Sequence, residues 1–259
     1  MTKRIYDDFS ENYDKFVNWE NRLKYELPFI EAQIQPLGSP AHVLDAACGT
    51  GMHTIALSQK GYRVAGADLS AGMIKRARVN ASNADQPIWF EQAGFGQMAP
   101  VFGEEQFDVV LCLGNSLPHL LSTREFLGAL EDFSKTLRPG GMLMIQNRNF
   151  DAVLAQAERW MEPQAYREGN QEWIFLRFYD FLPEGLLAFN IITLCKEADG
   201  IWQQSITTTM LQPLQHIEMV AALQLVGFVD IRTFGDMTGS EYDYMASGNL
   251  VITTLKKEA

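Results

Sequence analysis

Two glycines and two acids in the first third of the chain have types and a spacing suited to binding a small polar molecule. The segment VLDAACGTGMHT (43–54) places Asp45, Cys48, Gly49 and Gly51 between an apolar run and the start of a helical pattern. Glycine allows a ligand to approach the main chain, and the first turn of the following helix offers unpaired N–H groups. Asp68 ends the next apolar run and follows Gly49 by 19 residues. This spacing lets an acid reach ribose hydroxyls in a βαβ nucleotide-binding unit.

Dinucleotides and S-adenosylmethionine are the two ligand classes that share this layout. A dinucleotide site normally has a third glycine, and Thr54 stands at that position here. An acid beside the loop, Asp45, suits a sulfonium ligand that carries an α-amino group better than it suits a pyrophosphate. A plain strand-to-helix turn is the remaining alternative, and the presence of Asp68 disfavours it. At these residues the sequence resembles the class I S-adenosylmethionine-dependent methyltransferases, whose first motif runs acid-x-x-x-G-x-G.

The resemblance implies donor contacts along the loop and the following strand. It assigns Asp68 to both ribose hydroxyls and places Leu69 and Met73 beside the adenine. Many members have an acid after the third strand that binds the adenine amino group, but Gly94 stands there in this chain. The backbone, a water molecule or Gln92 would then form the hydrogen bond to the adenine amino group. The whole set of residues predicted to bind the donor is Arg22, Asp45, Ala46, Cys48, Gly49, Gly51, Asp68, Leu69, Met73, Gly94, Phe95, Leu113 and His119.

Two later segments resemble the glycine N-methyltransferases more specifically. CLGNSLPHL (112–120) matches their CLGNSxxHL run, and QNRNFDAVL (146–154) is similar to their HRNYDxIL segment. The resemblance implies that Arg148 holds the carboxylate of an amino-acid acceptor and that Asn115 faces it. A guanidinium suits that role because it forms two parallel hydrogen bonds to a carboxylate. A salt bridge at the edge of the sheet is the alternative for Arg148, and Asn147 and Phe150 depart from the His and Tyr of the family.

An arginine and a run of aromatic residues near the N-terminus complete the predicted site. In the family, an N-terminal arginine binds the methionine carboxylate of the donor, and Arg22 lies close to the corresponding distance before Asp45. Tyr6, Tyr13 and Trp19 could form a wall around the sulfonium, and Tyr13 joins Asn115 and Arg148 as a predicted catalytic residue. The alternatives are a solvated helix face for Arg22 and ordinary core packing for the aromatic residues.

The elements that position these residues follow from apolar periodicity. Short apolar runs alternate with helical patterns between residues 41 and 147, which predicts an α/β fold with a Rossmann-like, seven-stranded, mostly parallel sheet and helices on both faces. Three β-rich runs without intervening helices predict a small antiparallel insertion. We therefore expect an N-terminal helical cap (1–40), a donor-binding domain (41–164 and 213–259) and an inserted acceptor region or lid (165–212).

Composition limits the function further. The chain has 259 residues and a net charge of −11, so a large phosphate-binding surface for nucleic acid is disfavoured. No run of about 20 apolar residues predicts a membrane span. The first residues lack the apolar core of a signal peptide, and the three cysteines form no CxxC pair, so a cytoplasmic location is expected. No His/Cys spacing is typical of a catalytic metal site, and no G-x-S-x-G hydrolase motif occurs.

These observations predict an enzyme that transfers a methyl group from S-adenosylmethionine to a small molecule and releases S-adenosylhomocysteine. N-methylation of a carboxylate-bearing amine such as glycine or sarcosine is favoured through Arg148. O- or C-methylation of a larger apolar acceptor is an alternative, in which aromatic residues of the insertion (Trp173, Phe175, Phe178, Tyr179 and Phe181) would line a wide pocket and His119 would act as a base. A non-catalytic donor-binding module, an NAD-dependent reductase and a homo-oligomer also remain open.

Overall fold

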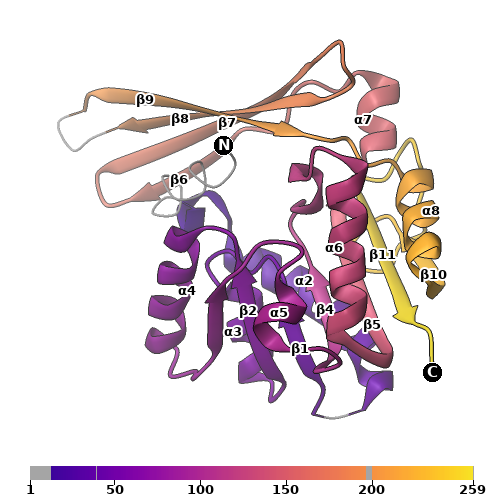
Figure 1. The fold of residues 1–259 in the computed structure, drawn as a ribbon. Helices are drawn as coiled ribbons and strands as arrows, with labels where there is room; N and C mark the ends of the chain where they lie inside the picture. Colours follow the sequence, from indigo (N-terminus) through magenta and orange to yellow (C-terminus); the bar gives the residue numbers. More distant parts are fainter. Residues whose placement is uncertain (1–12, 39, 197–199, 259) are drawn as a thin grey trace.

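The computed structural model describes residues 13–38, 40–196 and 200–258. Within them the chain forms two sheets. Sheet A has seven strands in the order β10-β11-β5-β4-β1-β2-β3, and sheet B has four in the order β6-β7-β8-β9. Sheet B lies across one end of sheet A (Figure 1). The seven-stranded, mostly parallel sheet and the antiparallel insertion that the sequence predicts are thus confirmed.

Sheet A is built around five parallel strands that are apolar on both faces. They are β1 (His42–Asp45), β2 (Arg63–Asp68), β3 (Trp89–Gln92), β4 (Phe107–Cys112) and β5 (Leu137–Arg148). Side chains alternate across the sheet, so Leu44 and Val110 enter one core while Val43 and Val109 enter the other. β11 (Asn249–Lys256) is antiparallel to both β5 and β10 (Phe228–Phe234). All five central strands therefore end at the same edge, where the loops carry the predicted site residues.

Helices cover both faces of sheet A. On one side are α2 (Trp19–Ile34), α3 (Met52–Gln59) and α4 (Ala71–Asn83), and on the other are α5 (Met98–Phe102), α6 (Thr123–Thr136) and α8 (His216–Val226) (Figure 1). Ser70 caps α4 by accepting a hydrogen bond from Met73 N at 3.1 Å. Within the described residues, no helix combines the length and the apolar character that a membrane crossing requires.

Sheet B follows α7 (Phe150–Gln156) and contains β6 (Gln164–Glu168), β7 (Gln171–Phe181), β8 (Leu187–Lys196) and β9 (Trp202–Leu211). It is joined to sheet A through the short helix η2 (Leu117–His119), because Gln212 N donates to Pro118 O at 2.7 Å. A helical turn at residues 13–16 fills the space between the sheets, where Phe16 packs on Phe175 with ring centroids 5.3 Å apart. The division into three domains that the sequence suggests stays a prediction.

Candidate active site

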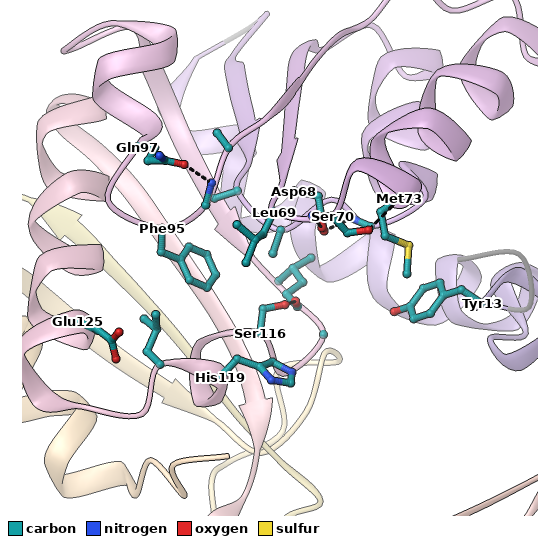
Figure 2. A pocket seen from close by; sticks show the side chains of 18 residues that line it. Tyr13, Asp68, Leu69, Ser70, Met73, Phe95, Gln97, Ser116, His119 and Glu125 are labelled. Atoms are coloured by element: carbon teal, nitrogen blue, oxygen red, sulfur yellow. Dashed lines mark hydrogen bonds between the residues drawn. The ribbon is translucent and has the colours of Figure 1, made fainter. Parts of the chain in front are cut away.

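A cavity of about 500 Å³ opens at the carboxyl edge of sheet A, between the β1–α3 loop, the β2–α4 loop and η2. Ten residues that were predicted to form the site line it: Tyr13, Ala46, Gly49, Asp68, Leu69, Met73, Gly94, Phe95, Leu113 and His119. Eight further residues outside the predicted set also line it: Ala47, Ser70, Ala93, Gln97, Gly114, Ser116, Leu120 and Glu125. Figure 2 shows Phe95, Ser116 and His119 on one side of the space and Tyr13 on the other.

Asp68 fixes the glycine loop at the wall of this cavity. Its Oδ2 accepts a hydrogen bond from Gly49 N at 3.0 Å, and its Oδ1 accepts one from Ser70 N at 2.9 Å. Gly49 has a φ of 53°, in the left-handed region that favours glycine. A Cβ atom at Gly49 would lie 3.8 Å from Tyr13 Cε1, so the tyrosine ring borders the loop. The acid, the loop and Tyr13 therefore meet at one side of the cavity, as the motif spacing suggested.

Gly94 contributes only main-chain atoms to the opposite end of the cavity. A Cβ atom there would lie 3.0 Å from Leu69 Cδ1, so the exposed Leu69 side chain would have to shift to admit a longer side chain. Gly94 N donates to Gln97 Oε1 at 2.8 Å, shown as a dashed line in Figure 2. Gln92, named in the sequence as a possible reader of adenine, instead donates to Leu69 O at 3.0 Å and does not line the cavity. Gln97, and not Gln92, lines this end of the cavity.

Asp45, Cys48 and Gly51 lie behind the loop and do not line the cavity. Asp45 is buried, and its Oδ2 accepts a hydrogen bond from the Thr54 hydroxyl at 3.1 Å. Burial raises the pKa of Asp45, although His53 and Thr54 oppose that rise. Cys48 is buried in a small core with Phe90, and burial raises the pKa of its thiol. This geometry does not support the direct donor contacts that were predicted for these three residues. The three residues instead stabilise the loop from behind.

Arg22 reaches the cavity edge from α2 through a buried polar network. Its Nε donates to Glu26 Oε2 at 3.1 Å and its Nη2 donates to Gln146 Oε1 at 3.3 Å. Gln146 Oε1 also accepts from Gly114 N at 3.1 Å, and Gly114 lines the cavity. His53 Nε2 lies 2.6 Å from Glu26 Oε2. Arg22 itself does not line the cavity, but its guanidinium lies beside residues that do.

Asn115 and Arg148 are brought together at the ends of β4 and β5. Arg148 N donates to Asn115 Oδ1 at 2.9 Å, and Asn115 N donates to Gln146 O at 3.0 Å. The side chain of Arg148 forms an ion pair with Glu158, with 2.7 Å between Nη2 and Oε2, while its Nε is buried without a hydrogen-bond partner. Neither residue lines the cavity, but Asn115 stands between Gly114 and Ser116, which do.

His119 faces the cavity from η2, and its Nδ1 lies 3.5 Å from the Thr209 hydroxyl of sheet B. Burial lowers the pKa of His119 to about 4, so the ring is neutral near pH 7 and a weak base. The aromatic residues of the insertion do not share one face. Trp173, Phe175 and Tyr179 are buried, whereas Phe178 points to the other face and stacks on Trp160 with centroids 4.9 Å apart. None of the five aromatic residues predicted to line a wide pocket lines this cavity, and Phe178 lies on the opposite face of β7 from the others because side chains alternate along a strand.

Comparisons with known proteins agree with the resemblance seen in the motifs. A family model described as a methyltransferase domain matches residues 43–141. The glycine/sarcosine N-methyltransferase of Aphanothece halophytica is 31% identical over 230 residues, which cover 89% of this chain and 82% of that protein. The enzyme of the same name from Parasynechococcus marenigrum (strain WH8102) is 32% identical over 235 residues, which cover 89% and 77%. The chain belongs to the glycine/sarcosine N-methyltransferase family.

Solved structures agree on the fold of this methyltransferase. An S-adenosylmethionine-dependent methyltransferase from Clostridium acetobutylicum superposes with a TM-score of 0.78 at 16% identity, covering 97% of this chain and 99% of that one. A sugar N-methyltransferase from Streptoalloteichus gives a TM-score of 0.73 at 19% identity, covering 98% and 93%. The chain is thus an S-adenosylmethionine-dependent methyltransferase enzyme, and S-adenosylmethionine is its methyl donor.

The cavity of this methyltransferase fits such a donor. It combines apolar side chains that can border a base (Leu69, Met73 and Phe95) with an acid and a glycine main chain at its other wall. In the part of the chain that the structure describes, no group of three or more His, Cys, Asp or Glu residues is arranged to hold a metal ion. Tyr6 lies outside the described residues. Trp19 does not line the cavity but packs edge-on against His53, with centroids 5.5 Å apart.

Glu26 and Gln146 are the main structural contributors that sequence reasoning missed. Both are polar residues within apolar stretches, at positions where the helix and strand patterns predict the core. A buried polar group needs hydrogen-bond partners, so such an interruption is itself a signal for a polar network. Their positions in YELPFIE and MLMIQN could have indicated one.

Proposed function

We propose that this methyltransferase transfers the donor methyl group to the nitrogen of a small amine that carries a carboxylate, glycine or sarcosine being the first candidates. Two relatives that match most of the chain have the printed name glycine/sarcosine N-methyltransferase. The observation that carries the proposal is the pairing of Asn115 with Arg148. Arg148 N donates to the Asn115 side chain at the ends of β4 and β5, and the guanidinium of Arg148 has a buried Nε without a hydrogen-bond partner. A carboxylate would supply the missing hydrogen-bond acceptor.

The titratable groups around the cavity favour an amine over an oxygen acceptor. An amine attacks with its own lone pair and needs no base at the moment of transfer, whereas a hydroxyl must lose a proton. His119 is a weak base with a pKa of about 4, and burial raises the pKa of Tyr13, so the tyrosine stays protonated. The Asp68 carboxylate accepts two main-chain hydrogen bonds, and Glu125 accepts one from the Ser122 hydroxyl at 2.9 Å. None of these four groups is suited to act as a strong base.

The donor supplies an activated methyl group, so the residues of this chain have to align the reactants and exclude water from them. In the proposed arrangement, Asp68 binds the ribose hydroxyls, Leu69, Met73 and Phe95 enclose the adenine, and Arg22 holds the donor carboxylate. Tyr13 and Leu113 border the methyl group, and the Asn115 amide faces the acceptor. Holding reactants in line at near-attack distance contributes about 7–11 kcal/mol in well-oriented reactions. We also propose a cytoplasmic location, which three free cysteines support.

Methyl transfer to a panel of acceptors tests the proposal. The wild-type enzyme should methylate glycine or sarcosine, with the methylated product identified by mass spectrometry, and phenols should not react. Arg148→Ala should raise the KM of the amine acceptor at least about tenfold, because a hydrogen bond to a charged group is lost, with the affinity for S-adenosylhomocysteine unchanged. Arg138→Ala is the matched control, since Arg138 lies at the other end of β5 and pairs with Asp108. Turnover of phenols alone would overturn the proposal.

A further inference from the structure

Arg177 is a charged residue on the inner face of sheet B. Residues two apart on a strand share a face, so Arg177 lies on the same side of β7 as Phe175 and Tyr179, which are both buried. Its guanidinium carbon lies 5.0 Å from the ring centroid of Phe16, and Phe16 belongs to the turn that fills the space between the two sheets. The side chain therefore points toward sheet A and not toward the outer surface.

The segment from Glu158 to Glu162 brings Arg177 close to Arg148. Met161 N donates to Arg177 O at 3.1 Å, so this segment runs beside β7. Arg177 Nη2 donates to Glu162 O at 3.3 Å, and Arg148 Nη2 pairs with Glu158 Oε2 at 2.7 Å. Two guanidinium groups, one from each sheet, thus contact the same short stretch of chain.

Both arginines retain an unsatisfied donor. The Nε atoms of Arg148 and Arg177 are buried and have no hydrogen-bond partner. Among the described residues, Arg177 forms no ion pair with a carboxylate, whereas Arg148 pairs with Glu158. Burial lowers the pKa of Arg177 and the nearby charge of Arg148 adds to this, although Tyr179 opposes it. Buried donors without acceptors and neighbouring like charges are both costly, so an anion between the two groups would be stabilising.

The ion pairs indicate which anion fits. Arg148 pairs with Glu158 and Arg159 pairs with Asp180, whereas Arg177 has no carboxylate partner among the described residues. A single carboxylate would supply the missing partner. A guanidinium binds a carboxylate through paired N–H groups, and each of the two arginines has an unpartnered Nε to offer such a group.

We propose that Arg177 is a second acceptor-binding residue, which holds the acceptor carboxylate from sheet B while Arg148 holds it from sheet A. The inference rests on the proposed function and narrows its substrate class to amines that carry one carboxylate close to the nitrogen. It also gives sheet B a direct role in acceptor choice, because without Arg177 the carboxylate would be held from one side only.

Arg177→Gln in the full-length enzyme is the first test. The KM for glycine or sarcosine should rise about tenfold to a hundredfold, since a charge-assisted hydrogen bond is lost. The affinity for S-adenosylhomocysteine should stay within about twofold of wild type. Glycinamide lacks the carboxylate, so the variant should lose its preference for glycine over glycinamide. The matched control is Arg167→Gln on β6, which removes the same charge from an exposed pair with Glu172 and should leave every value unchanged.

Acetate binding separates this inference from the proposed function. Acetate should raise the Tm of the wild-type complex with S-adenosylhomocysteine, acetamide should not, and Arg177→Gln should lose the acetate effect. If the enzyme methylates no amine but this pattern holds, the proposed function falls and the carboxylate site stands. An unchanged KM and an unchanged acetate response in Arg177→Gln would overturn the inference. If that variant does not fold, Arg177→Lys keeps the charge but loses the planar fork, and an unchanged KM there would overturn it equally.

Discussion

Glu26 is a buried carboxylate in α2 that three polar side chains contact behind the cavity. It is 4% exposed, accepts from Arg22 Nε at 3.1 Å and from Gln146 Nε2 at 3.1 Å, and lies 2.6 Å from His53 Nε2. Burial alone would raise the pKa of Glu26, but the hydrogen bond from His53 and the charges of Arg22 and His53 lower it to about 2. The charged form of Glu26 is therefore strongly favoured in the folded protein, and its carboxylate orients the Arg22 guanidinium.

Replacing Glu26 with Gln should destabilise the fold and weaken donor binding together. Breaking a buried ion pair typically costs about 3–5 kcal/mol, because the partner charge stays behind. Since the folded pKa lies below the unfolded value, the stabilisation by Glu26 is present above about pH 4.5 and is lost as the pH falls toward about 2. Denaturation of wild type and Glu26→Gln at pH 7 and pH 3 should show a gap that narrows in acid. Glu20→Gln, at an exposed site in the first turn of the same helix, should show a gap of at most about 1 kcal/mol at pH 7.

His119 gives a prediction about the pH dependence of catalysis. Its pKa of about 4 keeps the ring neutral throughout the range above about pH 5. The pH dependence of kcat/KM should then follow the free-amine fraction of the acceptor, rising with pH and shifting when an acceptor of different amine pKa is used. His119→Gln should leave the position of that rise unchanged. A rise that stays at one pH for both acceptors, and moves only in the variant, would instead make His119 the base.

The site residues that could be predicted from the sequence were those whose type and spacing indicate a function. Gly49 and Asp68 could be placed because the strand, loop and helix around them have clear apolar patterns, and the structure brings them within hydrogen-bond distance. Glu26 and Arg177 could not be placed in this way. Their functions depend on partners from distant segments, such as His53 for Glu26 and Glu162 for Arg177. A pattern within one segment can mark a polar residue at a core position, such as Glu26, but it does not identify the partners of that residue.

At the level of elements, the close approach of β2 and β3 to the glycine loop depends on one missing side chain. A Cβ atom at Gly66 in β2 would lie 2.7 Å from two atoms of the Phe90 ring and 3.1 Å from Cys48 Sγ. Phe90 is fully buried between α3 and α4, so it has little room to move. By contrast, a Cβ atom at Gly128 in α6 would meet no atom within 4 Å.

Gly66→Ala and Gly128→Ala should therefore change stability in opposite directions. Overpacking at Gly66 should cost about 1–3 kcal/mol, and the added helix propensity at Gly128 should contribute up to about 1 kcal/mol. Urea denaturation measures both changes. Gly66→Ala combined with Phe90→Leu should recover part of the loss, because the shorter side chain makes room for the methyl group. A Gly66→Ala protein as stable as wild type would show that the loop relaxes freely.

Elements with a clear apolar pattern were predictable, and elements without one were not. The helices α4, α6 and α8 and the strands of sheet A lie within a few residues of the positions that apolar periodicity predicts. β6, α5 and α7 span five, five and seven residues and were missed. In β6 the sequence QAYRE has four exposed side chains, so no alternation of apolar and polar residues marks it. Pairing with β7 determines that strand, and this information is not local.

At the level of the whole molecule, the proposed acceptor site lies where the two sheets meet. Sheet A supplies the donor cavity and Arg148, while sheet B supplies Arg177 and the hydroxyl of Thr209 beside His119. The turn at residues 13–16 joins both layers, since Tyr13 lines the cavity and Phe16 packs on Phe175. Asp14 fastens this turn to sheet A by accepting from the Thr50 hydroxyl at 2.6 Å. The net charge of −11 says little about the acceptor, because in the proposed site the acceptor is bound by local groups, Arg148 and Arg177.

This arrangement predicts an order in the effects of ligands on thermal stability. S-adenosylhomocysteine at about 100 times its Kd should stabilise the enzyme by about 2.7 kcal/mol, and NADH should not, because Thr54 and Asp45 disfavour a dinucleotide. For a protein of this size that corresponds to a Tm increase of roughly 5–10 °C. Acetate should add a further increase in the presence of S-adenosylhomocysteine and a smaller one without it, since the donor completes one wall of the acceptor site. Equal acetate effects with and without S-adenosylhomocysteine would show instead that the carboxylate binds away from the donor. Arg148 could not then position a carboxylate-bearing amine for methyl transfer.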